Sequence, residues 1–174
     1  MAVARTLDAV AAPLRATIKW PNDVFLRGRK CCGMLLESSV SGPRTASPDV
    51  VVLGVGLNVN QDRFPPELSD RAVSVKQAAR RPIERPPLFA DLLAHLEETY
   101  QALFSDDDFA ALRADYESRL HRRGQPITLR TTATGEPVHG RVRGITANGA
   151  LRLETKGTVQ TFYAGEVTSQ ETSG

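Results

Sequence analysis

The sequence contains few of the residues that would place it in a specialised class of protein. Only two of its 174 residues are cysteine, and because Cys31 and Cys32 are adjacent they cannot readily form a disulfide with each other. This cysteine usage favours a reducing compartment, and we expect a cytoplasmic protein. No apolar run approaches membrane-spanning length, and Arg5 and Asp8 interrupt the N-terminal residues, which therefore make a poor signal peptide.

An excess of one charge is also missing. The 22 basic and 20 acidic residues nearly cancel, which gives no general reason to expect a nucleic-acid or membrane partner. No metal triad and no serine or cysteine relay can be recognised. The three histidines stand alone, His95 and His121 on predicted helices and His139 on a predicted strand. The sequence has no internal repeat and no low-complexity tract.

The most informative stretch is residues 18–37, whose pattern predicts a hairpin of two strands. Alternation of apolar and polar residues predicts a first strand that stops at Pro21, because proline cannot donate to a strand ladder. Extended structure resumes, residues 27–30 turn the chain, and Cys31 to Leu36 returns as a buried strand. We expect the two ends of this hairpin to present three polar side chains, Asn22, Asp23 and Lys30.

These residue types are chemically suggestive. An amide, a carboxylate and a lysine at the ends of buried strands suit an anionic ligand with a metal ion, such as a nucleotide phosphate. Gly33 in the return strand would allow close approach of a ligand or another backbone, because it has no side chain. The alternative interpretation is an ordinary hairpin with a solvated basic turn.

A second apolar strand is predicted from Asp49 to Val59. Its first half is apolar on both faces, which is typical of a central sheet strand. The pair Gly54-x-Gly56 does not form a dinucleotide fingerprint, because the third glycine is missing and no helix opens after it. Asn58, near the strand end, could reach a nucleotide or a metal-bound water, or could simply start a turn.

Helical periodicity predicts three longer helices and a short one over residues 73–79. The first covers residues 2–12, the second begins at Pro86-Pro87 and reaches Phe104, and the third follows a capping segment at residues 105–108 and stops near Gly124. Apolar stripes on the last two helices predict core residues: Leu88, Phe89, Leu92, Leu93, Leu96, Tyr100, Leu103, Phe109, Leu112, Tyr116 and Leu120.

The C-terminal part changes to short alternating strands separated by turn signals such as Asn148-Gly149 and Lys156-Gly157. Four or five short strands here predict a small SH3-like barrel. The strands are expected at residues 127–132, 138–145, 151–155 and 159–163. Several arginines give the barrel positive charge, but there is little aromatic interleaving for base stacking. A docked accessory domain is therefore favoured over a nucleic-acid-binding barrel.

Three blocks of sequence carry a resemblance to a known family. They are Lys19-Trp-Pro-Asn-Asp23, then Arg29-Lys-x-x-Gly-Met-Leu-Leu-Glu37, then Val51-Val-Leu-Gly-Val-Gly-Leu-Asn-Val-Asn60. In their order and close to their spacing, these blocks resemble the biotin–protein ligase family. The segments Gly144–Leu151 and Phe162–Val167 resemble the pattern of that family's C-terminal domain.

The resemblance implies an α+β fold of the class II synthetase or biotin-ligase type. We expect a mixed sheet flanked by helices in residues 1–123, followed by an SH3-like barrel in residues 124–174. Nothing in the sequence matches the family's G-R-G-R-x-G-R loop, which folds over biotin and the adenylate. We therefore expect a catalytic domain that is incomplete at its N-terminus. The alternatives to an active ligase are a truncated relic, a gene-model fragment or a binding module of the same fold.

The family uses ATP and Mg²⁺ to convert biotin into biotinyl-5′-adenylate, and then transfers biotin to a lysine of a biotin carboxyl carrier domain. The resemblance implies that Lys30 binds the biotin carboxylate and the α-phosphate, where negative charge builds up. Asp23 would orient the site or help to accept the proton of the incoming amine. No nucleic-acid or membrane partner is expected, and the resemblance leaves a homodimer open.

The remaining roles that the resemblance implies concern ligand binding. Asn22 and Asn58 would hold the nucleotide or its Mg²⁺, with Asn58 acting on the metal through water. Gly33 would give biotin access to the strand backbone. Trp20 would pack beneath the site or form part of the biotin-binding wall.

Overall fold

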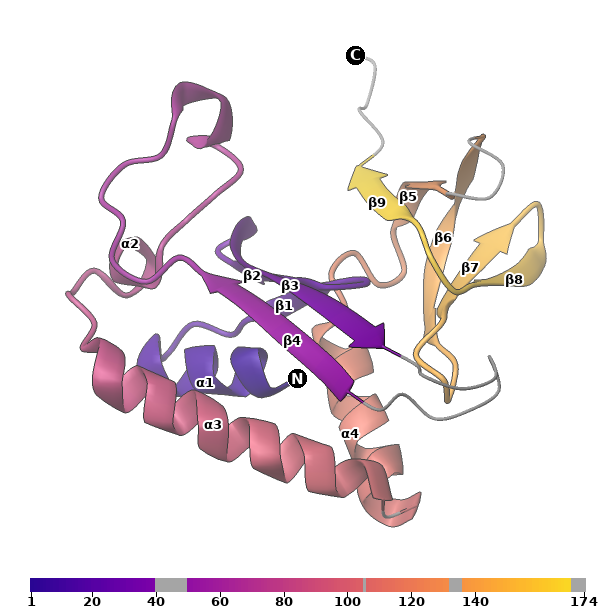
Figure 1. The fold of residues 1–174 in the computed structure, drawn as a ribbon. Coiled ribbons are helices and arrows are strands. Elements are labelled where there is room, and N and C mark those ends of the chain that lie inside the picture. The colour runs from indigo at the N-terminus through magenta and orange to yellow at the C-terminus, as the bar shows by residue number, and fades with distance from the viewer. Residues whose placement is uncertain (40–49, 105, 132–135, 170–174) are drawn as a thin grey trace.

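The computed structural model describes residues 1–39, 50–104, 106–131 and 136–169, which form two sheets with helices around the first. Figure 1 shows the two sheets side by side. The first sheet has the strand order β1-β2-β3-β4 and the second the order β8-β7-β6-β5-β9. The bounds of the first four strands are β1 (Thr17–Lys19), β2 (Asp23–Leu26), β3 (Arg29–Ser39) and β4 (Val50–Leu57).

The predicted helices are present, with small shifts at their ends. They are α1 (Ala2–Val10), α2 (Val75–Ala79), α3 (Arg85–Gln101) and α4 (Asp106–Arg119), with 3₁₀ turns at Pro66–Leu68 and Ala102–Phe104. A capping box of Ser74 and Gln77 starts α2. The expected capping role of Ser105 lies outside the described residues. Among the residues described, no helix is long and apolar enough to cross a membrane.

The first sheet is antiparallel, so the prediction of a mixed sheet was wrong for the described strands. Each neighbouring pair from β1 to β4 runs antiparallel. Short turns join β1 to β2 and β2 to β3, and such connections can join only antiparallel neighbours. The parallel contacts found here are isolated bridges, between Ile18 and Leu120 and between Lys30 and Ala72.

Helix α1 packs on one side of this sheet and is itself flanked by α3 (Figure 1). The core between them contains side chains that are almost fully buried from α1 and the first three strands. They include Leu7, Ile18, Val24, Leu26 and Cys31. This buried layer packs β1, β2 and the first residues of β3 against α1. The opposite face of the sheet does not contact α1.

The outer halves of β3 and β4 are exposed, which corrects two predictions. The return strand is buried at Cys31 and Cys32, but Leu36 is 63 % exposed. The strand predicted as central lies at the edge of the sheet that the described residues form, and Val52 on β4 is 56 % exposed. These residues are exposed because β3, with 11 residues, extends beyond β1 and β2, which have three and four residues. No described element covers the extra length.

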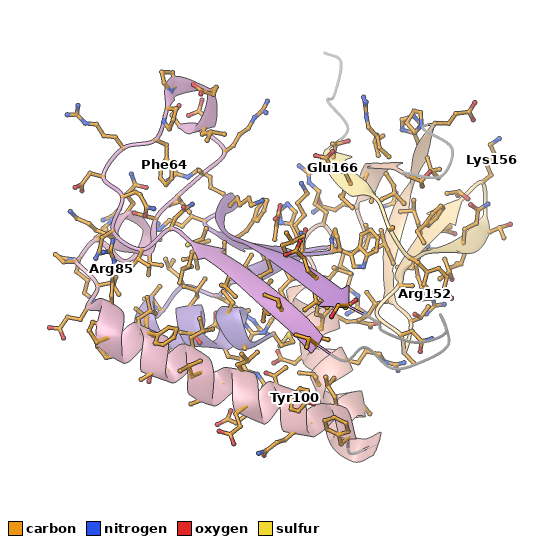
Figure 2. The ribbon with its side chains drawn as sticks, in the orientation of Figure 1. Phe64, Arg85, Tyr100, Arg152, Lys156 and Glu166 are labelled. Carbon is orange, nitrogen blue, oxygen red and sulfur yellow. The ribbon has the colours of Figure 1, made fainter. Side chains whose placement is uncertain are left out.

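The apolar stripe of α3 is also only partly core. Leu88 is buried and Leu92 is half-buried, but Phe89 and Tyr100 are exposed. Figure 2 shows Tyr100 near the C-terminal end of α3. An apolar groove of about 710 Å³ runs between α3 and β4. The expectation that the whole stripe is core was therefore wrong for the described residues.

The second sheet is a five-stranded unit, and the predicted C-terminal strands are present in it. Its core includes Ile127, Leu129, Leu151 and Leu153, all at most 1 % exposed. The turn expected between its first two strands lies partly outside the described residues. The strand bounds are β5 (Pro126–Arg130), β6 (Pro137–Ile145), β7 (Leu151–Thr155), β8 (Thr158–Phe162) and β9 (Glu166–Ser169).

Candidate functional site

An open cleft of about 1490 Å³ lies between the two sheets. One wall is formed by strands of the first sheet and the other by β5, β6 and β9. Figure 2 shows Phe64, from the loop after β4, and Glu166, at the start of β9, on opposite sides of this space. The cleft therefore collects side chains from segments that are far apart in the sequence.

An ion pair of Lys30 and Asp23 lies in the cleft. The Lys30 Nζ atom is 2.6 Å from Asp23 Oδ1, which is the distance of a strong charge-assisted hydrogen bond. The backbone of Lys30 is also fixed, because its N–H donates to Arg71 O at 2.8 Å and its carbonyl accepts from Val73 N at 2.9 Å. The Lys30 side chain is 46 % exposed and that of Asp23 is 14 % exposed. Lys30 can therefore meet a ligand from solvent, whereas Asp23 is the buried end of the pair.

Two glycines form the floor beside this pair. Lys19, Asp23, Gly33 and Gly56 are successive partners across the four strands of the first sheet. A Cβ atom on Gly33 would lie 3.0 Å from Lys30 Cε and Nζ and 3.4 Å from Asp23 Oδ1. The absence of a side chain at Gly33 thus provides the space that the ion pair occupies.

Asn58 lies at the end of β4 on the same cleft. Its N–H donates to Cys31 O at 2.9 Å, and its carbonyl accepts from Val75 N at 2.8 Å. Its side-chain amide Nδ2 donates to Val73 O at 3.5 Å, a long hydrogen bond. These contacts hold Asn58 next to β3, the strand of Lys30, and no donor among the described residues bonds to its side-chain oxygen.

Known proteins match this chain in sequence and in fold. A family model described as the biotin protein ligase C-terminal domain matches residues 124–168. The chain is 32 % identical over 169 residues to the bifunctional ligase/repressor BirA of Bacillus spizizenii, covering 96 % of this chain and 50 % of the relative. It is 38 % identical over 162 residues to the biotin–[acetyl-CoA-carboxylase] ligase of Paracoccus denitrificans, covering 88 % of this chain and 62 % of the relative.

These matches identify residues 124–168 as a biotin protein ligase C-terminal domain, and the chain as a whole is similar to biotin–protein ligases.

The fold agrees with this assignment. The structure of the biotin protein ligase of Aquifex aeolicus in complex with biotin and ATP superimposes with a TM-score of 0.79 at 24 % identity, over 96 % of this chain and 66 % of that one. The chain spans about half the length of the Bacillus relative. The resemblance predicted from the three sequence blocks is therefore confirmed at the level of family and α+β fold.

The structure brings Asp23, Lys30, Gly33 and Asn58 together in the cleft, but it places Asn22 elsewhere. The Asn22 side chain is exposed, and its Nδ2 donates to Met34 O at 2.6 Å. Its carbonyl also accepts from Met34 N at 3.0 Å. Both bonds tie the turn before β2 to β3 instead of pointing an amide into the cleft.

Trp20 lies in the core of the second sheet. It is 5 % exposed, packs with Leu120 and Ile127, and donates from Nε1 to Gly149 O at 2.9 Å. It is not among the residues that line the cleft. Of the two roles expected for Trp20, this position agrees with packing beneath the site.

The two cysteines are unsuited to nucleophilic catalysis. Both thiols are free and buried. Burial, with the neighbouring Cys32, raises the pKa of Cys31 to about 12. Burial, with the charge of Asp23, raises the pKa of Cys32 to about 11. Both therefore stay protonated near neutral pH, and the reactive thiolate is scarce.

His121 is a cleft residue that the sequence did not indicate. The helix on which we expected it ends at Arg119, and His121 follows in the turn. Its ring packs against Phe25 with centroids 5.0 Å apart, and it lines the cleft. Burial lowers its pKa, and the charges of Arg122 and Lys19 lower it further, so the ring is neutral at pH 7. No pattern links residues 25 and 121 in the sequence, because only the tertiary fold brings them together.

No preformed metal centre is evident in the part of the chain that the structure describes, because no three His, Cys, Asp or Glu side chains there could hold an ion together. The cleft carboxylates are Asp23, Asp70 and Glu166, and Asp23 is paired with Lys30. Mg²⁺ is commonly bound by one or two carboxylates together with substrate phosphates. The side chains present fit that mode of binding, and they do not fit an all-protein cage.

Proposed function

We propose that this chain carries the active-site face of a biotin–protein ligase, which activates biotin with ATP and then transfers it to a lysine of a carrier domain. The observation that carries this proposal is the ion pair of Lys30 and Asp23 above Gly33, formed by two of the sequence blocks that match the family. The similar Aquifex enzyme is bound to biotin and ATP, and the Paracoccus relative is a biotin–[acetyl-CoA-carboxylase] ligase.

Lys30 would neutralise charge in the first step. Attack of the biotin carboxylate on the α-phosphate brings two anions together, so a cation at this point lowers the barrier. The Lys30 side chain is 46 % exposed and can exchange one carboxylate partner for another with a short movement. Asp23 would hold the ammonium in place before the ligands arrive, and then orient it or help to accept the proton of the attacking lysine.

The neighbouring residues would position the ligands. Gly33 would let biotin approach the strand backbone, since a side chain there would meet Lys30. Asn58 would offer its side-chain oxygen to the nucleotide or to a water on Mg²⁺, which would arrive with the phosphates. Asn22 would contribute by fixing the turn through Met34. Trp20 would support the site from the second sheet.

The acceptor in this proposal is a biotin carboxyl carrier domain, and the reaction takes place in the cytoplasm. Two free thiols agree with a reducing compartment. We also propose a division into a catalytic part, residues 1–123, and a barrel, residues 124–174. Support comes from the family model, which begins at residue 124, and from β5, which begins at Pro126.

The test is biotin-dependent release of pyrophosphate from ATP and Mg²⁺, followed by transfer to a purified carrier domain. We expect release that requires biotin and that falls about 10²- to 10³-fold in Lys30→Ala. Lys156→Ala is the matched control, because Lys156 is an exposed lysine in the β7–β8 turn and does not line the cleft. Release without biotin, or an active Lys30→Ala variant of native fold, would contradict the assignment. A chain that binds ATP without releasing pyrophosphate would instead support a binding module of the same fold.

A further inference from the structure

The turn between β2 and β3 lies at the rim of the cleft and carries two arginines. Arg27 and Arg29 flank Gly28, and both Gly28 and Lys30 line the cleft. Arg27 is exposed and Arg29 is half-buried, and neither is among the residues that line the cleft. The two arginines therefore lie beside the Lys30 site without forming part of it.

A hydrogen bond joins this turn to helix α2. Arg27 Nε donates to Ala78 O at 3.2 Å, in the last turn of the helix. Arg80 follows two positions later as the C-cap residue of α2, and it is exposed. Arg27 and Arg80 thus lie on adjoining segments of the surface.

On its other side the same turn contacts the loop that follows β4. Arg29 Nη1 donates to Ser69 O at 3.4 Å, and Lys30 N donates to Arg71 O at 2.8 Å. Arg71 is exposed and lines the edge of the cleft. The turn therefore gathers arginines from three segments, which we call the rim patch: Arg27, Arg29, Arg71 and Arg80.

Two of these arginines have a backbone conformation that side chains disfavour. The φ angle is 51° at Arg27 and 58° at Arg80, in the left-handed region. Glycine or asparagine is usual at both kinds of position, a two-residue hairpin turn and the C-terminal cap of a helix. The Arg27 side chain holds α2, but no hydrogen bond or ion pair joins the Arg80 side chain to the rest of the described chain. Arg80 therefore adds charge to the surface at a cost in backbone strain, which favours a role in contact with a partner.

The rim patch carries a net positive charge. None of its four arginines forms an ion pair with a described residue. Of the carboxylates on the adjoining loop, Asp62 is paired with Lys76 at 2.6 Å, which leaves Glu67 and Asp70 beside the patch. The arginines thus outnumber the remaining carboxylates on this surface, and such an excess speeds the approach of an acidic partner.

The rim patch borders the route of a protein acceptor to Lys30. The acceptor in the proposed function is a folded domain, which is too large to enter a cleft of about 1490 Å³. Only its lysine side chain can reach Lys30, so the surface around that lysine must rest on the rim. Guanidinium groups pair with carboxylates in a bidentate geometry, so an acidic surface fits the rim patch.

We propose that the rim patch is a docking surface for an acidic face of the carrier domain, next to the lysine that receives biotin. This proposal rests on the proposed function, which supplies the identity of the acceptor. Docking here holds the target lysine at the opening above Lys30 and leaves the first step of the reaction to the cleft residues. Arg27 and Arg80 act on binding of the acceptor alone, since neither lines the cleft.

The experiment measures the affinity of the whole chain for a purified biotin carboxyl carrier domain by surface plasmon resonance at low ionic strength. We expect the Kd to rise about threefold in Arg27→Asn and in Arg80→Asn, and about tenfold when both are changed, because each loses an attractive charge at the rim. The differences should shrink at high salt, where the charges are screened. Asparagine tolerates a positive φ, so both variants keep the local backbone.

Two controls separate charge from backbone effects. Lys156→Asn removes a cation from a left-handed position with a φ of 50° in the β7–β8 turn of the barrel, labelled in Figure 2, which does not line the cleft. It should bind the carrier as the unmodified chain does. Arg27→Lys keeps the charge and should raise the Kd by less than about twofold.

Four results would overturn the docking surface. They are no carrier binding by the unmodified chain, no loss in the two asparagine variants, an equal loss in Lys156→Asn, and an equal loss in Arg27→Lys. Binding of duplex DNA that depends on Arg27 and Arg80, with carrier binding unchanged in their variants, would also overturn it and indicate a nucleic-acid surface.

The outcome separates the docking surface from the proposed ligase activity. Biotin-dependent pyrophosphate release without the carrier should be the same in the double variant and the unmodified chain. Carrier binding that depends on Arg27 and Arg80, in a chain without such release, would support the surface and refute the ligase function. Release and transfer with an unchanged KM for the carrier in the double variant would support the ligase function and refute the surface.

Discussion

The ammonium group of Lys30 lies over Gly33, 2.6 Å from the carboxylate of Asp23, in the space that a side chain at position 33 would fill. Two adjacent strands of one antiparallel sheet, β2 and β3, thus shape this charged pair and the room around it. A single methyl group at position 33 would displace the Lys30 ammonium group, so this contact can be tested by one substitution.

Gly33→Ala should reduce activity far more than stability. The new methyl group would lie 3.0 Å from Lys30 Cε and Nζ, so the flexible lysine must move away. We expect pyrophosphate release to fall about 10- to 100-fold, because small displacements of a catalytic group are costly. The free energy of unfolding should change by less than about 1 kcal/mol.

Gly54→Ala is the control for this change. It adds the same methyl group to the next strand, where the nearest atom is Leu35 O at 3.6 Å, an ordinary contact. Steady-state kinetics and urea denaturation should show a variant close to the unmodified chain. If Gly54→Ala and Gly33→Ala lose activity equally, the space above Gly33 has no special role.

Asp115→Asn should destabilise the chain at neutral pH and not at low pH. Burial raises the pKa of Asp115, but hydrogen bonds and charges from Arg119 and Arg5 outweigh it and hold the pKa below its usual 3.8. A depressed pKa gives stability that is complete above the unfolded-state value and is lost as the pH falls through the folded-state value. We expect a loss of about 2 kcal/mol at pH 7.

Urea denaturation at a series of pH values measures this effect. The difference between Asp115→Asn and the unmodified chain should shrink below pH 3.8. Asp91→Asn is the control, because Asp91 is exposed on α3 and makes no ion pair in the described chain. A difference that stays constant down to the acid transition would show that the pairing with arginine is not its cause.

Trp20→Phe should weaken the attachment of the two sheets. It keeps an aromatic ring in the core but removes the donor to Gly149 O, leaving a carbonyl without that partner. We expect a loss of about 1 kcal/mol in the free energy of unfolding, measured by thermal or urea denaturation.

Tyr163→Phe is the comparison for this variant. Tyr163, in the bend directly after β8, is 75 % exposed, so loss of its hydroxyl should change stability by less than about 0.5 kcal/mol. A Trp20→Phe variant as stable as Tyr163→Phe would indicate that the bond to Gly149 contributes nothing measurable.

The cysteines should resist alkylation in the folded chain. Both are buried, and their pKa values are raised to about 12 for Cys31 and about 11 for Cys32. At pH 8, iodoacetamide should leave both unmodified while it reacts with Gln160→Cys, a thiol introduced on the exposed face of β8. In urea, mass spectrometry should find both native thiols modified. Rapid reaction of either one in the folded state would contradict the burial described here.

Local features of this fold could be predicted from the sequence because they depend on neighbouring residues. Pro13 and Pro86-Pro87 mark helix ends, Ser74 and Gln77 cap a short helix, and paired turn residues separate the C-terminal strands. The nearness of residues 23 and 30 could also be anticipated, because one predicted hairpin presents both, although the ion pair itself was not predicted. In each case the interaction joins residues within a few positions of each other.

Only the tertiary structure decided which apolar surfaces are buried and which distant residues share the cleft. The sequence predicted a buried stripe on α3 and a central strand at residues 49–59, since both are apolar, yet burial depends on what packs against them. Two roles were open for Trp20, packing or part of a ligand wall, and its burial in the core of the second sheet agrees with packing. The position of His121 in the cleft was not predicted. It depends on hydrogen bonding between the residues after α4 and β1, which are far apart in the sequence. The local sequence therefore determined the strands, the turns and the hairpin that carries residues 23 and 30. Long-range packing determined which apolar surfaces are buried and which distant residues line the cleft.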